Sequence, residues 1–210
     1  MTVSASEKID FTMMYVTHDA FRRDLARFIA AAEADRCETP GVRAGWENFR
    51  TQLLLHHTVE DNALWPQLRE AVADRPTDLA LVEEMEAEHA ELDPLLAAVD
   101  AALTDKASAA RPGDLAERVA AVLGHHLQHE EKAALPLIQS ALTPAHWKAF
   151  SGQMRRRQGV KGTATYVPWI LDGASPERRR DFLAVMPPPV RILHRVSWER
   201  RYRQREFWIS

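Results

Sequence analysis

The chain has 210 residues, of which 46% are apolar and 27% are charged, and glycine is scarce. This composition excludes a disordered or fibrous protein, and the length allows one sizeable domain with its own core. The formal net charge of −3 conceals an asymmetry: residues 155–210 carry 13 Lys and Arg against 5 Asp and Glu, whereas residues 1–154 carry 14 against 25. The chain is therefore an acidic body with a basic tail.

Three absences in the sequence bear on where the protein works. The single cysteine, Cys37, cannot form an internal disulfide or a thiolate metal site alone, and it suits a reducing compartment. Residues 1–10 are polar, unlike a signal peptide. No apolar run approaches the roughly 18 residues that a spanning helix needs. We therefore expect a cytoplasmic protein.

The first two predicted helices follow from apolar residues that recur at three- and four-residue steps. One helix is predicted over 9–36, with His18 in the middle of its apolar stripe, and Thr39-Pro40-Gly41 separates it from the next. The second is predicted over 43–72. Pro66 lies inside this pattern and should bend or interrupt the helix.

Two further helices complete the main part of the chain. One is predicted over 78–104, where Pro94 could introduce a kink, and the other over 114–141, where Pro136 mirrors Pro66. The polar stretch 105–113 is expected to be a loop. Four long helices joined by short connections predict an all-α, up-down-up-down four-helix bundle over residues 9–142.

An internal repeat supports this architecture. His18 and His89 are 71 residues apart, and His56 and His126 are 70 apart. A two-helix unit used twice would place both halves around a common centre.

Residues 143–210 are expected to form a basic extension that packs on the bundle. Thr143-Pro144 and Ser175-Pro176 are typical helix starts. We predict helices over 144–154, 176–185 and 190–205, and an extended strap over 166–171. Arginine clusters with interleaved aromatic residues leave contact with nucleic acid or an anionic membrane as an alternative to packing.

The most informative motif occurs twice: His56 and His126 are each followed by three residues, a glutamate, five residues and a proline. Residues four apart share a helix face, with Cβ atoms about 5–6 Å apart, so each copy directs an imidazole and a carboxylate to one point. Both copies lie in apolar stripes, where an unpaired charge would cost several kcal/mol. This pattern predicts metal ligands rather than polar side chains that face solvent.

Together with the lone histidines of the other two helices, the motifs supply six candidate ligands: His18, His56, Glu60, His89, His126 and Glu130. Taken alone, His18 or His89 would more often be a core residue whose ring nitrogens are hydrogen-bonded within the protein. Mixed nitrogen and oxygen donors suit iron or manganese better than calcium or magnesium, and zinc usually needs only four ligands. Six donors fit two ions bridged by the two glutamates and a solvent-derived group.

This arrangement assigns His18 and His56 to one ion, and His89 and His126 to the other. Five neighbouring polar residues are expected to point elsewhere, in solvated or outer positions: His57, Asp61, His125, His129 and Glu131. We accordingly predict that Glu60→Ala or Glu130→Ala abolishes dinuclear loading and that His57→Ala leaves it intact.

The segments THDAFRRDL, HHTVEDNALWP, EAEHAEL and HHLQHEEKAALP resemble the hemerythrin-like, or HHE cation-binding, family, in its bacterial type with a C-terminal extension. The resemblance covers about residues 10–141. It implies a non-haem centre of two iron ions, which cycle between Fe2+ and Fe3+, with an oxo or hydroxo bridge, at the same six positions. Such a centre binds or reacts with O2, peroxide or nitric oxide.

One position departs from the oxygen-carrying members, which have a second histidine where this chain has Met85. The resemblance therefore favours an open, reactive centre, in an oxidoreductase that consumes peroxide or nitric oxide in detoxification. Tyr15, one turn before His18, is a candidate phenol for the vacant side, with a core aromatic as its alternative. The alternative function is an O2- or iron-sensing or storage module without turnover.

Overall fold

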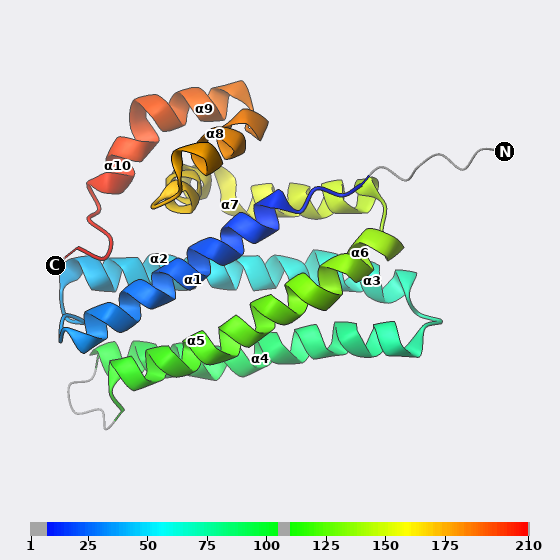
Figure 1. Cartoon of the computed structure of the whole chain (residues 1–210), viewed down its shortest axis with the longest axis horizontal. Helices are drawn as coiled ribbons and strands as arrows, with labels where there is room; N and C mark the ends of the chain where they lie inside the picture. The colour runs from blue at the N-terminus through cyan, green and yellow to red at the C-terminus, as the bar shows by residue number, and fades with distance from the viewer. Residues whose placement is uncertain (1–7, 105–109, 210) are drawn as a thin grey trace.

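The computed structural model describes residues 8–104 and 110–209, and within these residues all regular secondary structure is helical (Figure 1). The helices of the main body are α1 (Thr12–Glu33), α2 (Pro40–Val59), α3 (Trp65–Ala71), α4 (Pro76–Thr104), α5 (Pro112–His129) and α6 (Leu135–Ala141). Those of the C-terminal part are α7 (Pro144–Leu171), α8 (Pro176–Val185), α9 (Pro188–Leu193) and α10 (Glu199–Arg203). The expected loop falls partly on residues 105–109, which lie outside the described part.

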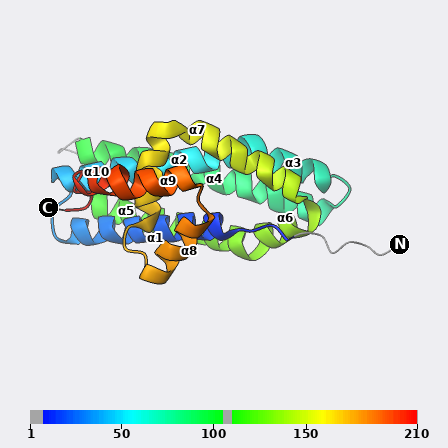
Figure 2. The same cartoon turned by 90° about the horizontal axis from the view of Figure 1, so that it is seen from above.

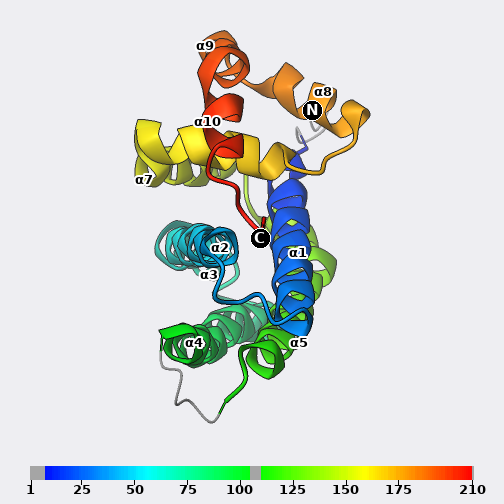
Figure 3. The ribbon, with the colours of Figure 1, turned by 90° about the vertical axis from the view of Figure 1, so that its left-hand side faces the viewer.

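The predicted up-down-up-down bundle is confirmed. Its four members are α1, α2 with α3, α4, and α5 with α6, and each runs opposite to the one before it (Figure 1). Helix α1 packs against α2 and α5, and α4 packs against α5. A view along the bundle shows these four members around a common axis (Figure 3).

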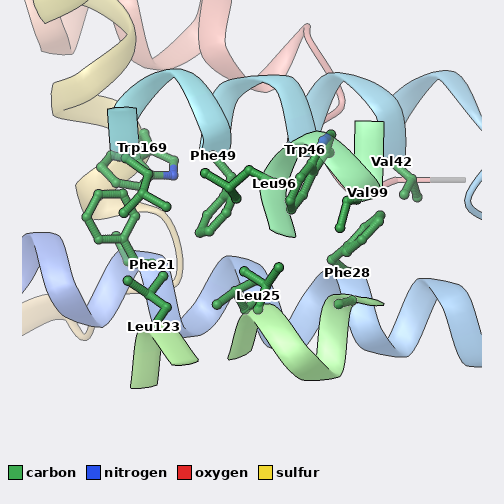
Figure 4. Packing of buried hydrophobic residues seen from close by; sticks show 14 of the residues in the cluster. Phe21, Leu25, Phe28, Val42, Trp46, Phe49, Leu96, Val99, Leu123 and Trp169 are labelled. Atoms are coloured by element: carbon green, nitrogen blue, oxygen red, sulfur yellow. The ribbon is translucent and has the colours of Figure 1, made fainter. Parts of the chain in front are cut away.

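One end of the bundle has an aromatic core (Figure 4). Phe28 of α1 stacks on Trp46 of α2 with ring centroids 4.8 Å apart, and Trp46 stacks on Phe49 at 5.3 Å. Leu96 and Leu123 bring α4 and α5 to the same cluster. These residues belong to the three- and four-residue apolar stripes, so helical periodicity places them on one buried side.

Each interruption predicted at Pro66 and Pro136 is a single π-helical turn that ends just before the proline. The two turns cover Glu60–Leu64 and Glu130–Ala134. A proline has no N–H to donate to the carbonyl four residues earlier, and the preceding residue instead donates to the carbonyl five residues earlier, Glu60 or Glu130. Each π turn therefore begins at a glutamate of the repeated motif, which explains the fixed distance from glutamate to proline.

Helix α4, by contrast, continues through Pro94, whose ring is on the exposed side. None of the helices that the structure describes has the length and apolar character needed to cross a membrane.

The expected extended strap over 166–171 is wrong. This segment is helical and forms the end of α7, after a sharp turn at Gly159, whose φ of 58° suits glycine. Val167, Trp169 and Ile170 are buried against the bundle, and this burial outweighs the poor helix propensity of the local sequence. The predicted helix starts at Thr143 and Ser175 are confirmed, because both hydroxyls accept a backbone N–H from the first helical turn.

The C-terminal helices form a layer on one side of the bundle. Helix α7 lies on α1 and α2, and α8 to α10 lie above it (Figures 2 and 3). The last residues return to the start of α2, where the Trp208 N–H donates to the Gly41 carbonyl at 2.8 Å. The Trp208 indole rests on Gly45, where a Cβ would lie 2.5 Å from the ring. Arg178 forms an ion pair with Asp19 of the acidic body.

Candidate metal centre

All six predicted ligands lie in the interior of the bundle. They come from α1, α2, α4, α5 and the two π turns, and none is more than 5% exposed: His18, His56, Glu60, His89, His126 and Glu130. Buried imidazoles and carboxylates in such numbers are unusual in a core unless they are paired or bind a metal.

The donor atoms gather in two groups. In the first, donor atoms of His18, His56 and Glu130 lie within 4.8 Å of one another. The second contains His89 and His126, whose Nε2 atoms are 3.1 Å apart. Glu60 lies between the groups, since its Oε1 is 3.0 Å from the His56 Nε2 and its Oε2 is 3.7 Å from the His89 Nε2.

His57 also belongs to the second group, contrary to our expectation that it points elsewhere. Its side chain is buried, and one ring nitrogen lies within 4.8 Å of those of His89 and His126. The reason is that α2 contacts α1, α4 and α7, so a residue one position along from His56 still faces the interior. A signal was present in the sequence, because the apolar stripe through Phe49 and Leu53 continues as naturally to His57 as to His56.

Tyr15, the candidate phenol, does not reach these groups. Its side chain is 44% exposed, whereas its neighbour Met14 is buried. The inner face of α1 runs through Met14 and His18, which are four residues apart. Tyr15 lies three residues before His18 and falls at the edge of this face, so neither a catalytic role nor a core position fits it.

Three carboxylates form hydrogen bonds with the outward-facing Nδ1 atoms of three of these imidazoles. The His18 Nδ1 is 2.8 Å from Glu131 Oε1, the His89 Nδ1 is 2.7 Å from Asp61 Oδ1, and the His126 Nδ1 is 2.8 Å from Glu88 Oε2. A carboxylate accepts the N–H, so each neutral ring carries its proton on Nδ1 and directs a lone pair on Nε2 inwards. This is the arrangement by which proteins orient histidines that bind metals.

Two of these carboxylates occupy the same position in the two copies of the repeated motif. Asp61 follows Glu60 and Glu131 follows Glu130, and each contacts the lone histidine of a neighbouring helix. The expected outer position of Asp61 and Glu131 therefore has a specific use, which is to orient His89 and His18. His129 and the exposed His125 lie near Glu88.

Most of the inward donor atoms have no hydrogen-bond partner. Buried atoms with no hydrogen-bond partner include Nε2 of His18, His56 and His57 and both carboxylate oxygens of Glu60 and Glu130. With protons on Nδ1, the Nε2 lone pairs of His89 and His126 oppose each other at 3.1 Å. A cation among these atoms would satisfy them together, so the residues present fit a metal centre.

The family comparison agrees with this geometry. The sequence model of the hemerythrin HHE cation binding domain matches residues 10–138. The chain belongs to the hemerythrin HHE cation-binding domain family. Among curated proteins and solved structures, none matches it. Family membership and the two histidine and carboxylate groups together indicate that the HHE domain of this chain binds a metal cation.

Burial and the neighbouring charges shift the pKa values of the inner residues in different directions. Burial lowers the pKa of His18, but the carboxylates of Glu130, Glu131 and Glu60, with Glu130 first, more than compensate and raise it to about 9. Burial lowers the pKa of His56 to about 3, with His18 adding to the effect. Burial and the Glu130 charge raise the pKa of Glu60 well above its ordinary value. Burial thus disfavours the charged forms of Glu60 and His56, whereas the neighbouring carboxylates favour the charged form of His18.

The helices beyond the HHE domain reach the back of this centre. The Tyr166 hydroxyl is 2.7 Å from that of Thr17, the residue before His18. Trp169 contacts Phe21 at a centroid distance of 5.4 Å, and Phe21 contacts His56 at 5.5 Å. The Trp169 indole donates to the buried Asp24 at 2.7 Å. Helix α7 therefore supports α1 beside its ligand-bearing turn.

Proposed function

We propose that the chain holds two iron ions between the four helices of the HHE domain and uses them to bind and turn over a small oxidant, namely O2, peroxide or nitric oxide. The observation that carries this proposal is the convergence of unpaired, buried nitrogen and carboxylate donors in two adjacent groups, with Glu60 between them. The assignment is His18 and His56 to one ion, His89 and His126 to the other, with the two glutamates as bridges.

The donor set favours iron over the alternatives. Four imidazoles with two carboxylates suit a divalent transition metal, whereas calcium and magnesium prefer oxygen alone. Six donors exceed the four of a structural zinc site. Two iron ions here would supply reversible one-electron changes and a coordination position for a small ligand.

The residues of the chain have separate tasks in this proposal. Asp61, Glu88 and Glu131 keep the imidazole protons on Nδ1, so that the Nε2 atoms remain available as ligands. Arg22 bonds the same Glu131 oxygen at 2.9 Å and balances its charge. Buried apolar residues such as Phe21 and Trp65 keep bulk water away from the donors. We place this activity in the cytoplasm, because the lone cysteine suits a reducing compartment.

Binding without turnover is the second candidate, as a sensing or storage module for O2 or iron. The position of Tyr15 favours it, because the phenol expected at the vacant side is turned towards solvent. Such a module would release its ligand unchanged.

Metal analysis and absorption spectroscopy of the full chain test both candidates. We expect two iron ions per chain and near-ultraviolet bands of a bridged ferric pair. Continuous loss of added peroxide or nitric oxide would support the enzyme, whereas a stable, reversible O2 complex without turnover would support the module. A chain that takes up one ion or none after anaerobic loading with Fe2+ would contradict the dinuclear centre.

A further inference from the structure

The two copies of the repeated motif differ at one buried position. When His56 is aligned with His126, Glu60 falls on Glu130, and the residue after the first histidine is His57 in one copy and Leu127 in the other. His57 is 6% exposed and Leu127 is fully buried. Leucine therefore fills this position in one half of the bundle, so packing alone does not require an imidazole in the other half.

The surroundings of His57 point to a ligand. Its ring stacks on that of His89 with centroids 3.8 Å apart and planes 10° apart, and it meets His126 edge-on at 5.2 Å. Ring nitrogens of all three lie within 4.8 Å of one another. The Nε2 of His57 is buried and has no hydrogen-bond partner. A polar atom left in this state destabilises the fold unless something binds it.

We propose that His57 is a third nitrogen ligand of the metal ion held by His89 and His126. This inference rests on the dinuclear centre proposed above and makes its two positions unlike. One position would have three imidazoles, from α2, α4 and α5, and the other would have two, from His18 and His56, with the bridging Glu130 carboxylate nearest to it. Glu60 lies between them.

A ligand role for His57 changes the consequence of having methionine at position 85. On the sequence alone, the methionine leaves one ion short of an imidazole and therefore more open. With His57 supplied by the facing helix, that ion has three nitrogen ligands. Nitrogen-rich sets bind later first-row metals more tightly, while carboxylate favours the earlier, harder ones. The two positions should therefore differ in affinity and fill at different concentrations of a given metal.

Titration of the chelated full-length protein with Co2+ tests the proposal, because the visible bands of Co2+ report its ligands. The test variant is His57→Leu, which uses the residue found at the equivalent position. The matched control is His125→Leu, since the His125 side chain is 73% exposed. We expect two Co2+ ions per chain in the wild type and in the control. In His57→Leu, one of the two positions should bind Co2+ at least about tenfold more weakly. Even the loss of a residue that only hydrogen-bonds to a ligand lowers metal affinity by about 10–100-fold.

Unfolding in urea separates a ligand from a packing residue. If His57 is a ligand, the chelated His57→Leu protein is at least as stable as chelated wild type, because the unpaired nitrogen is gone, and Co2+ raises its unfolding midpoint less. A packing role predicts a chelated variant that is less stable and gains as much from Co2+ as wild type does.

The outcome that would overturn the ligand role of His57 differs from the one that would overturn the dinuclear centre. Two Co2+ ions bound to His57→Leu with wild-type affinity and spectrum would overturn the role of His57 and leave the dinuclear centre standing. A wild-type chain that takes up no Co2+ and no Fe2+ would overturn the centre, and with it the ligand role of His57.

Discussion

Replacing Glu60 with glutamine should stabilise the metal-free protein and weaken the metal-bound one. Both Glu60 oxygens are buried without a hydrogen-bond partner. Burial and the charge of Glu130 raise the pKa of Glu60, so keeping this carboxylate ionised opposes folding increasingly as the pH rises above its ordinary pKa. A neutral amide removes this penalty. We expect the free energy of unfolding of the chelated variant to rise by about 1–3 kcal/mol, because a buried group without a partner costs more when it is charged than when it is a neutral amide.

Metal should reverse this order of stability. In the proposed dinuclear centre, at a free metal concentration about 100 times the Kd, each ion would add about 2.7 kcal/mol to the free energy of unfolding, so two ions would add about 5 kcal/mol to wild type. Glu60→Gln loses the carboxylate between the two groups, and we expect it to keep the contribution of one ion at most. The free energy of unfolding of the metal-loaded variant should therefore be about 0–2 kcal/mol lower than that of metal-loaded wild type, whereas without metal the variant is the more stable of the two.

The assay is urea unfolding followed by circular dichroism, for chelated and Fe2+-loaded protein under anaerobic conditions. Glu117→Gln is the control, because this glutamate of α5 is exposed and its replacement should change neither value. A chelated Glu60→Gln protein that is clearly less stable than chelated wild type, or that metal stabilises as much as wild type, would contradict this role of Glu60.

Three further outcomes are expected. Asp61→Asn and Glu131→Gln should each lower metal affinity by about 10–100-fold in a competition titration with a coloured chelator, while circular dichroism shows the fold retained. Trp169→Ala should cost about 3–5 kcal/mol of unfolding free energy in urea, and Trp169→Phe clearly less, since Trp169 is fully buried; equal losses would contradict its packing role. In chelated protein, the His18 pKa is raised from 6.5 to about 9. Its contribution to stability is thus complete below pH 6.5 and disappears as the pH rises through about 9, a decline that His18→Gln should abolish in unfolding curves across this range.

Local features of the sequence were sufficient for the bundle and for most of its centre. Helical periodicity depends only on spacing along the chain, so the four long helices and their buried stripes could be predicted. The prolines at 66 and 136 remove backbone donors, so the interruptions could be predicted, although not that each is a π turn beginning at a glutamate. The four-residue spacing of His56 and Glu60 predicted their common direction.

Tertiary contacts decided the remainder. Whether His57 faces the interior depends on α2 being covered by three other helices, and whether Tyr15 faces it depends on where the inner face of α1 is centred. Residues 166–171 have little helical tendency of their own, and they are helical because Trp169 and its neighbours are buried against α1 and α2. The sequence by itself determined which donors exist and which share a helix face. The packing of helices distant in the chain decided which of them meet, because the side of a helix that is covered depends on its neighbours in space.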